Sequence, residues 1–565
     1  MPNSVYNEEF ANCARNMVFH TAFHWQAASS SLLSYSRVTV VANRLADALT
    51  DDTFKGIHKM MPFDWAMIIP YFAVLSILSI YGLHRYAMIR GYWKHRKQFT
   101  GEPPTRFATL PRVTIQLPIY NERYVVERLL EETAKVDYPR ELLQIQVLDD
   151  STDDTHPFTQ RLVEEYAETG LPIEYIHRTN RHGFKAGALE NGLKTATGEI
   201  VSIFDADFVP PRDFLHRTVH YFAEEKVGMV QTRWGYLNRH QSVLTEVQAM
   251  LLDGHFVLEH VARGGAGLFF NFNGTAGVLR KSMIQDAGGW QHDTLTEDSD
   301  LSYRAQLKGW KFVYDPSIEC LSELPVETYG FQVQQSRWAK GLTQVAKKLL
   351  LSVLKADLPL RVKAEAFFHL TPNISYPLMI VISVMMLPVM IVRFYMGWLE
   401  MLLIDFPLIV ASFWSISAFY VVAHRELFPK TWKRAFLFLP ALMAAGVALT
   451  IINSRAVFEA LIGYKTEFAR TAKYGQQGRK VTDNKYRRRS GWLPYAELLA
   501  GTGFLAMTVY AINSYNYLAV PFLMLFVGGY FWAGATTLWQ EYQGKLAFER
   551  ARELATEQAQ AEAEA

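Results

Sequence analysis

Ile200-Val-Ser-Ile-Phe204 is a short apolar run, and Asp205-Ala-Asp207 follows it directly. A short apolar run that ends on carboxylates is typical of a buried strand with polar side chains at its carboxyl end. The pattern recurs at 113–117, before Tyr120-Asn-Glu122, and at 143–148, before Asp149-Asp150. A fourth short strand is expected at 173–176. Stretches of helical periodicity separate these runs, which predicts an α/β domain with a parallel sheet.

Ligands of such sheets bind at the carboxyl ends of the strands, where these polar clusters lie. Asp205 and Asp207, one residue apart on a turn, suit a hard divalent cation such as Mg²⁺ or Mn²⁺. The alternative is that the pair caps the next helix. Because a second strand ends on Asp149-Asp150, which could recognise a nucleotide base or ribose, we favour a functional site. Between them, the Lys185 and Arg181 side chains offer positive charge for a diphosphate, although a basic helix start explains them equally well.

Two further motifs follow in the sequence. Thr296-Glu297-Asp298 precedes a helical run, which it could cap, and it could also supply a general base. Gln334-Gln-Ser-Arg337-Trp338 places Gln, Arg and Trp on one helical face, where Trp offers a flat surface for a sugar ring. The alternative for this Trp is packing at a membrane interface.

Long apolar stretches flank this middle region. Residues 65–84 are apolar enough to cross a bilayer, and the basic residues at 85–97 place their far end in the cytoplasm. After the domain at 106–342, we expect an interfacial helix at 343–370, two spans within 376–423, and two more within 492–538. The remaining segments are the mixed N-terminal segment 1–64 and a polar helical tail at 540–565 in the cytoplasm.

The segment 434–464 is harder to assign. Its apolar part, 436–452, could just span a membrane, but the basic stretch 455–489 would then lie outside. We therefore expect an interfacial helix here, followed by a basic loop at 465–490. The prediction is a multi-pass protein of a cell membrane, with five spans and a cytoplasmic central domain.

Composition limits the function. The formal net charge of the 565 residues is only +2, which gives no reason to expect a nucleic acid partner. Two cysteines, Cys13 and Cys320, are too few for a disulfide framework or a cysteine metal site. An aromatic content of 14% is consistent with membrane interfaces or sugar stacking.

The order Asp, Asp-x-Asp, Glu-Asp and Gln-x-x-Arg-Trp over about 112–341 resembles the membrane-embedded family 2 glycosyltransferases. These include cellulose synthases, mannan and glucan synthase-like proteins, hyaluronan synthases and ceramide glucosyltransferases. Phe272-Asn273-Gly274-Thr275 matches a loop that the family uses near the acceptor. Cellulose synthases typically carry Cys where this chain has Asn273, so the chain looks more like the mannan and glucomannan branch.

The resemblance implies a nucleotide-sugar-binding GT-A-type domain with a mixed or parallel sheet, inserted between transmembrane helices. It implies an inverting hexosyltransferase in which Asp298 is the base and Asp205 and Asp207 hold the metal. It assigns the nucleotide sugar to Tyr120, Glu122, Asp149, Asp150, Lys185, Asp205, Thr471 and Lys473. It assigns the acceptor to Asn273, Gly274, Thr275, Glu297, Gln334, Arg337 and Trp338.

Phe468-Ala-Arg470-Thr471-Ala-Lys473 resembles the Phe-x-Val-Thr-x-Lys gating loop of cellulose synthases, with Arg in place of Val. A plain basic linker is the alternative. The gating loop and the number of later helices favour a processive synthase that polymerises and exports a β-glycan. A non-processive enzyme that glycosylates a lipid acceptor has the same four motifs. UDP-glucose and GDP-mannose both remain possible donors.

Overall fold

The computed structural model describes residues 59–99, 101–394, 404, 407–408, 410–465, 473, 475, 486, 489–514, 516–517 and 519–564. The chain divides into two compact units. Met1–Asp64 with Met390–Phe406 form one, most of which lies outside the described residues. Trp65–Val389 with Pro407–Ala565 form the other, which contains the sheet and all the structure discussed below.

A seven-stranded sheet is the centre of this larger unit, with strand order β3-β2-β1-β4-β6-β5-β7. The first four strands in this order are mutually parallel, as the sequence predicted. Their bounds are Val113–Ile119 for β1, Leu143–Asp149 for β2, Ile173–His177 for β3 and Ile200–Ile203 for β4. Strands β1, β2 and β4 are almost completely buried, which explains their continuous apolar sequences.

The other half of the sheet departs from the parallel pattern. Strand β6 (Gly277–Arg280) runs antiparallel to both of its neighbours, β4 and β5 (Val227–Tyr236). Strand β7 (Lys311–Ser322) then pairs in parallel with β5. The sheet is therefore mixed. The antiparallel strand brings the loop before β6 to the same edge as the carboxyl ends of β1 and β4.

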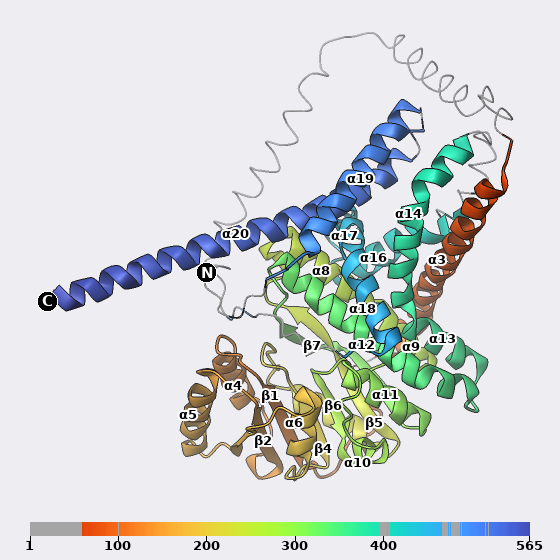
Figure 1. Ribbon diagram of the computed structural model, residues 1–565. Coiled ribbons are helices and arrows are strands. Elements are labelled where there is room, and N and C mark those ends of the chain that lie inside the picture. The colour runs from red at the N-terminus through yellow and green to blue at the C-terminus, as the bar shows by residue number, and fades with distance from the viewer. Residues whose placement is uncertain are drawn as a thin grey trace, which may run out of the picture. The chain divides into compact units, whose positions relative to one another are not determined.

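Helices cover both faces of the sheet (Figure 1). Two large apolar clusters lie on its faces, one around β1, α4 and α5 and the other around α6, α9 and α11. The helices of this domain are α4 (Val126–Ala134), α5 (Thr155–Glu168), α6 (Phe184–Leu193), α7 (Phe214–Thr218), α8 (Val243–Asp253), α9 (His260–Ala266), α10 (Lys281–Asp286) and α11 (Glu297–Leu307). A π-helical segment, Gly254–Glu259, joins α8 to α9.

Helix α12 (Thr328–Lys355) is longer than the sequence suggested. The boundary expected at 342/343, between the central domain and the interfacial helix, falls inside α12. The Gln334–Trp338 motif and the first half of the expected interfacial segment therefore belong to one continuous helix. The helix ends before Asp357-Leu-Pro359, where proline cannot continue it, and α13 (Leu360–Leu370) follows. Lys340 and Lys347 of α12 bind Glu459 and the carbonyl of Leu461 in α18 (Thr450–Ile462).

Four described helices are long and apolar enough to cross a membrane, counted as Pro62–Gln98, Pro372–Arg393, Leu493–Asn513 and Val520–Ala547. They contain α3 (Pro62–His95), α14 (Ser375–Phe394), α19 (Leu493–Asn513) and the first part of α20 (Val520–Glu564). These match four of the five expected spans. The polar tail is part of α20 and not a separate helix.

The fifth expected span, at 404–423, falls partly outside the described residues. What is described there is a π-helical segment, Val410–Trp414, and α16 (Ser415–Leu427). The difficult segment 434–464 is two helices, α17 (Ala435–Ala448) and α18, bent by 41° at their junction. If this pair is one broken span, the described residues contain five.

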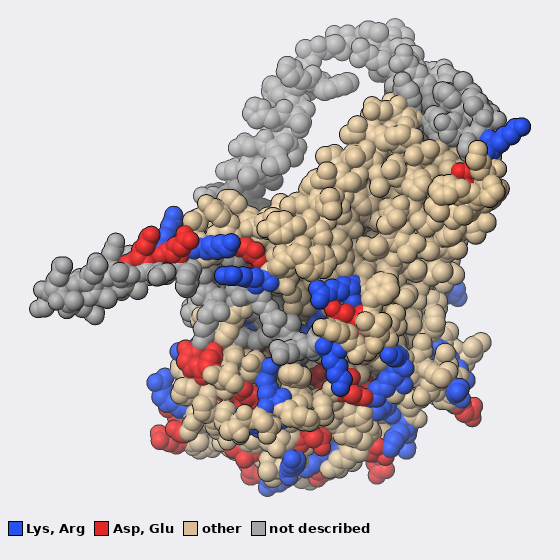
Figure 2. Space-filling model, in the orientation of Figure 1, with Lys and Arg blue, Asp and Glu red and all other residues tan. Residues whose placement is uncertain are grey.

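Charged side chains are unevenly distributed. In Figure 2, lysines, arginines and carboxylates gather over the sheet-containing part, while the visible face of the apolar helices carries almost none. Leu437, Leu499 and Val384 are among the large apolar side chains exposed on these helices. Such a surface is typical of a membrane-embedded protein.

Candidate active site

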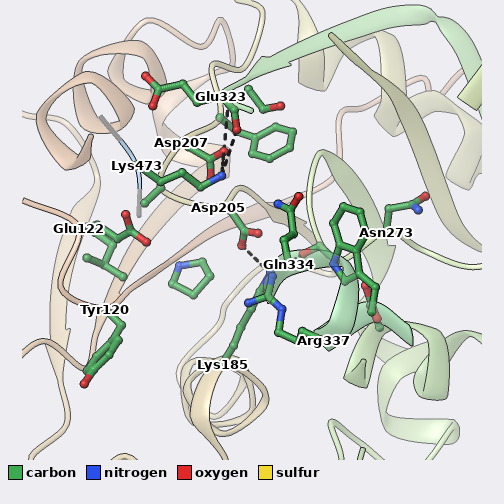
Figure 3. Close-up of a pocket in the computed structure, with 18 of the residues that line it drawn as sticks. Tyr120, Glu122, Lys185, Asp205, Asp207, Asn273, Glu323, Gln334, Arg337 and Lys473 are labelled. Carbon is green, nitrogen blue, oxygen red and sulfur yellow. Dashed lines mark hydrogen bonds and ion pairs between the residues drawn. The ribbon is translucent and has the colours of Figure 1, made fainter. Parts of the chain in front are cut away.

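A polar pocket lies at the carboxyl ends of β1 and β4, below α12 (Figure 3). Its lining includes residues at the ends of β1, β2 and β4, in the loop before β6 and at the start of α11. Residues of α6, β5, α8 and α12, Lys473 and the segment after β7 also line it. The sequence motifs, which lie far apart in the chain, therefore meet in one place.

Lysines contact both carboxylates of the Asp-x-Asp motif. The Lys185 Nζ lies 2.5 Å from the Asp205 Oδ1, and the Lys473 Nζ lies 2.7 Å from the Asp207 Oδ2. Burial opposes a charge on Lys185, but Asp205 and Glu297 outweigh this effect and raise the pKa of the lysine. The ammonium group of Lys473 also donates to the carbonyl of Glu323. Each carboxylate thus faces a positive charge.

The β1–β2 side of the pocket carries two further features. The Arg178 Nε and Nη2 donate hydrogen bonds to the two carboxylate oxygens of Asp150. The guanidinium of Arg181 lies 3.3 Å from the centroid of the Tyr120 ring. Such a stacked cation and ring can face the flat base or the phosphates of a nucleotide.

Asp149 lies beneath this surface. Its side chain is fully buried, accepts hydrogen bonds from the Tyr175 hydroxyl and the Ser151 amide, and does not line the pocket. Of the two neighbouring aspartates, Asp150 is the one that the pocket exposes.

The loop before β6 connects the two sides of the pocket. Asn273 and Gly274 line it, and the Gly274 carbonyl accepts a hydrogen bond from Lys185 at 2.8 Å. Thr275 is buried, and its hydroxyl accepts from the Asp205 amide at 2.9 Å. Gly274 has φ +81°, and a Cβ there would lie 2.8 Å from the Asp298 Oδ2. Glycine is therefore required both by the backbone and by the carboxylate opposite it.

Glu297 and Asp298 begin α11 and point into the pocket from its floor. Burial, and then the neighbouring charge of Glu297, raise the pKa of Asp298 to about 7. A carboxyl group with such a pKa can take up a proton at neutral pH, as a general base must. The Cβ of an alanine at Gly341 would lie 2.4 Å from the Thr296 Cγ2, so this glycine lets α12 pack directly on the residue before Glu297.

Gln334, Arg337 and Trp338 project from one face of α12, as their spacing predicted. Figure 3 shows Gln334 and Arg337 close to Asp205 and Lys185. Burial lowers the pKa of Arg337, and the negative charges of Glu297 and Asp205 oppose this effect. A cation, a ring and an amide therefore face the carboxylates across the pocket.

The structure brings most of the expected residues together. Those that line the pocket are Tyr120, Glu122, Asp150, Lys185, Asp205, Asp207, Asn273, Gly274, Glu297, Asp298, Gln334, Arg337, Trp338 and Lys473. Asp149 and Thr275 lie beneath it, and Thr471 lies outside the described residues. The roles given to these residues remain predictions.

Sequence reasoning missed Glu323. It lines the pocket directly after β7, binds Arg128 through its carboxylate at 2.7 Å, and donates its amide to the Asp207 Oδ2. Glu323 follows a strand, as Asp150 and Asp205 do, so the same reading of strand ends could have found it. Gln231 of β5 is buried and binds the backbone of Asn273 and Thr275. Its neighbour Trp234 does line the pocket.

The charge of the pocket bears on the expected metal. Among the described residues, seven acidic side chains line it against four basic ones, Arg181, Lys185, Arg337 and Lys473. The acidic residues are Glu122, Asp150, Asp205, Asp207, Glu297, Asp298 and Glu323. An anionic diphosphate would meet this excess of carboxylates unless further positive charge entered with it. The donor set, oxygen atoms only, suits Mg²⁺ or Mn²⁺.

Comparison with known proteins agrees with this geometry. Residues 111–341 match the family described as "Glycosyltransferase like family 2". These residues contain the β-sheet and the four motifs that the sequence analysis singled out. The mixed α/β sheet, with apolar helices beside it, agrees with the mixed or parallel sheet that the sequence led us to expect.

Curated relatives of this glycosyltransferase domain come from plants. Glucomannan 4-beta-mannosyltransferase 1 of Oryza sativa subsp. japonica is 41% identical over 262 residues, which are 45% of this chain and 50% of the relative. Glucomannan 4-beta-mannosyltransferase 9 of Arabidopsis thaliana is 42% identical over 252 residues, 43% of this chain and 47% of the relative. The chain spans about half the length of the curated relatives it matches.

A mannosyltransferase from Pyrobaculum calidifontis, solved with GDP-Man and Mn²⁺, is among the similar structures. It is 24% identical, with a TM-score of 0.45, over 63% of this chain and 99% of that one.

Proposed function

We propose that this protein is an inverting hexosyltransferase that extends a β-glycan from a nucleotide diphosphate sugar. The observation that carries the proposal is the convergence, in one pocket of a family 2 domain, of Asp298 with the Asp205–Asp207 pair and the Gln334–Trp338 face. A base, a set of diphosphate ligands and a sugar-stacking surface are the parts that such a transfer requires.

The β1–β4 side would hold the nucleotide and its diphosphate. Asp150, Tyr120 and Glu122 lie where a nucleoside would enter, and Lys185, Lys473 and Arg337 would neutralise the departing diphosphate. Asp205 and Asp207 would hold Mg²⁺ or Mn²⁺, which supplies further positive charge to the diphosphate when bound. The excess of carboxylates in the pocket supports this assignment.

Asp298 would remove the proton from the acceptor hydroxyl. The oxygen of that hydroxyl would then form the new bond to the anomeric carbon, while the bond from that carbon to the diphosphate breaks on the opposite face. Trp338 would stack on the terminal sugar of the acceptor, and Gln334, Asn273, Gly274 and Glu297 would orient it. A pKa near 7 makes the Asp298 carboxylate available for this step at neutral pH.

GDP-mannose is the donor we favour over UDP-glucose, because the curated relatives are named as mannosyltransferases and this chain carries Asn273, as the resemblance to the mannan branch implied. The four candidate spans and the α17–α18 pair beside the catalytic domain support a processive enzyme of a cell membrane that also exports its product. In this arrangement the catalytic domain faces the cytoplasm, and Thr471 and Lys473 belong to a loop that closes over the nucleotide.

The test uses the full-length protein in detergent with Mg²⁺ or Mn²⁺. Radiolabelled GDP-mannose or UDP-glucose is offered with a mannan or glucan oligosaccharide, and products are separated by size and by extraction into organic solvent. We expect a high-mass product that a β-mannanase digests. A short, extractable product that requires added lipid would contradict the polymer proposal and support a glycolipid product, and no product from either sugar would overturn the proposed activity.

A further inference from the structure

Two histidines bind the side chain of Asn273 from behind the pocket. The His260 Nε2 lies 2.6 Å from the Asn273 Oδ1, and the His255 Nε2 lies 2.9 Å from the Asn273 Nδ2. The centroids of the two imidazole rings are 4.2 Å apart. The two rings therefore lie next to each other, and the Nε2 of each contacts one polar atom of the amide.

The π-helical segment Gly254–Glu259 makes this arrangement possible. In an α-helix, two residues five apart in sequence point about 140° away from each other. The i→i+5 hydrogen bonds of a π-helix bring such residues onto the same side. His255 and His260 are five residues apart, and the π-helical segment ends directly before His260.

The direction of each hydrogen bond follows from Glu259. Its Oε2 lies 3.0 Å from the His255 Nδ1 and 3.1 Å from the Arg263 Nη1. Arg263 and His255 outweigh the effect of burial and hold the pKa of Glu259 well below its ordinary range, so this group is a carboxylate. A carboxylate only accepts, and so the His255 Nδ1 must carry a hydrogen. The Asn273 Nδ2 can only donate, so the His255 Nε2 that it contacts carries no hydrogen and accepts from it.

His260 completes the assignment. It is fully buried, and burial and the adjacent His255 hold its pKa well below the ordinary range, so its imidazole is neutral. Since the Asn273 Oδ1 can only accept, the single hydrogen of His260 lies on its Nε2. If the Asn273 amide were flipped, two donors would face each other at His260 and two acceptors would face each other at His255.

The cluster is anchored on the far side of the domain. The Arg263 Nε binds the Glu365 Oε1 of α13 at 2.8 Å, and the Glu365 Oε2 lies 2.8 Å from the His84 Nε2 of α3. Arg263 and Glu365 expose only 3% and 6% of their side chains. A connected set of hydrogen bonds and ion pairs holds a single arrangement better than isolated contacts do.

The primary amide of Asn273 has two hydrogens and two lone pairs. The histidines use one of each, which leaves one donor and one acceptor on the amide of a residue that lines the pocket. The same loop continues into Gly274, which binds Lys185, and Thr275, which binds the Asp205 amide. The orientation of the Asn273 amide is thus fixed relative to the diphosphate side of the site.

We propose that His255 and His260 are positioning residues that hold the Asn273 amide in one orientation, so that it presents one donor and one acceptor to hydroxyl groups of the acceptor sugar. This rests on the proposed transfer to a glycan. The histidines touch neither substrate. Their effect is on the affinity and alignment of the acceptor, and the nucleotide side of the pocket does not depend on them.

The test measures acceptor and donor separately in the full-length protein. The variants are His260→Phe, which removes the donor to the Asn273 Oδ1, and His260→Gln, whose amide nitrogen can replace the Nε2 hydrogen. His240 provides matched controls, His240→Phe and His240→Gln, since it is 78% exposed and pairs with Glu246 away from the pocket. Binding of mannohexaose or cellohexaose is measured by calorimetry with GDP or UDP and Mn²⁺ present, and transfer and donor hydrolysis are followed with labelled sugar nucleotide.

We expect His260→Phe to raise the Kd and the KM for the oligosaccharide by about 10-fold to 100-fold, the effect of an unpaired buried polar group. Nucleoside diphosphate binding and hydrolysis of the donor by water should stay within about 2-fold of wild type, the scatter allowed for a distant change. His260→Gln should recover most of the affinity, and both His240 variants should behave as wild type.

Equal losses for oligosaccharide and nucleotide in His260→Phe, or no loss at all, would overturn the positioning role. If His260→Phe does not fold, as judged by lost nucleotide binding, the decision falls to His255→Gln, whose carbonyl can still accept from Asn273, and His255→Leu, which cannot. Wild-type acceptor affinity in His255→Gln with a loss confined to the acceptor in His255→Leu supports the role, and equal behaviour of the two variants contradicts it. Failure of the wild-type protein to transfer sugar would instead refute the proposed function, which the variants do not test.

Discussion

The two sides of the pocket hold their carboxylates in different ways. On the β1–β4 side, Asp150, Asp205 and Asp207 each face a cation, respectively Arg178, Lys185 and Lys473. On the opposite side, Asp298 stands next to another carboxylate, Glu297, and its pKa is raised to about 7. On the β1–β4 side the carboxylates are therefore paired with cations. On the other side Asp298 can gain and lose a proton near neutral pH.

The comparison explains why similar residues serve different chemistry. A carboxylate paired with a lysine can release it when a diphosphate and a divalent cation arrive. A carboxyl group with a pKa close to the working pH can act as a base. The loop 273–275 touches both sides, because Gly274 approaches Asp298 and also binds Lys185.

Removal of the base should have the largest effect. Asp298→Asn is expected to lower kcat for transfer by about 1,000-fold or more, near the upper range for a general base. Nucleotide binding with Mn²⁺, measured by calorimetry, should stay close to wild type because the other side of the pocket is untouched. Asp293→Asn is the control, since that carboxylate is 58% exposed and pairs with Lys348. Retained polymer synthesis in Asp298→Asn would rule out this base.

Removing a carboxylate charge on the β1–β4 side should weaken nucleotide binding and leave acceptor binding nearly unchanged. Asp205→Asn or Asp207→Asn is expected to weaken Mn²⁺-dependent nucleotide binding by about 100-fold, because one of two metal ligands loses its charge. Binding of an oligosaccharide acceptor alone should change little. An unchanged dependence of nucleotide binding on Mn²⁺ concentration would show that the metal binds elsewhere.

The loop that joins the sides should be sensitive to a single methyl group. Gly274→Ala is expected to lower kcat/KM by about 10-fold to 100-fold, since the residue has a positive φ and its Cβ would press on Asp298. Gly267→Ala is a control, because that glycine also has a positive φ but has no neighbouring atom within 4 Å of the added Cβ. Equal losses in both variants would assign the effect to backbone strain alone.

The pH dependence of transfer should follow Asp298. Below its pKa of about 7 the group is protonated and cannot accept a proton, so kcat should rise about tenfold per pH unit up to that point and then level off. Nucleotide binding measured over the same range should not follow this curve. A rate that is flat from pH 5 to 8 would contradict the assignment.

The smallest effect is on stability. Because the pKa of Asp298 is raised in the folded state, its ionisation becomes a growing penalty as pH rises from about 4 to about 7. Asp298→Asn should therefore have a higher Tm than wild type at pH 8, and the difference should shrink toward pH 5. A Tm difference that does not change with pH would show that ionisation of Asp298 does not destabilise the folded protein.

The sequence predicted the four strands β1 to β4, of which β1, β2 and β4 are buried apolar runs that end on polar clusters. It did not predict β5, β6 or β7. Strand β6 has only four residues, Gly277–Arg280, and is defined by its pairing with β4 and β5 rather than by its own pattern. The local sequence contains no record of such distant pairing.

The candidate site shows the same limit. Asp205, Asp298 and Trp338 were recognisable from motif order. The burial of Asp149 depends on the Tyr175 hydroxyl and the Ser151 amide, which become its neighbours only in the fold. The histidine pair behind Asn273 depends on one extra residue in a helical turn, which periodicity alone does not reveal.

Helix α12 links the chemistry to the membrane-facing part of the molecule. From Trp338 at the pocket it runs without interruption to Lys355, a rise of about 25 Å at 1.5 Å per residue. Gly341 packs it against Thr296, and Lys340 joins it to Glu459. The helix is therefore a continuous connection between the pocket and α18, so a displacement of α18 would be transmitted to the α12 side chains that line the pocket.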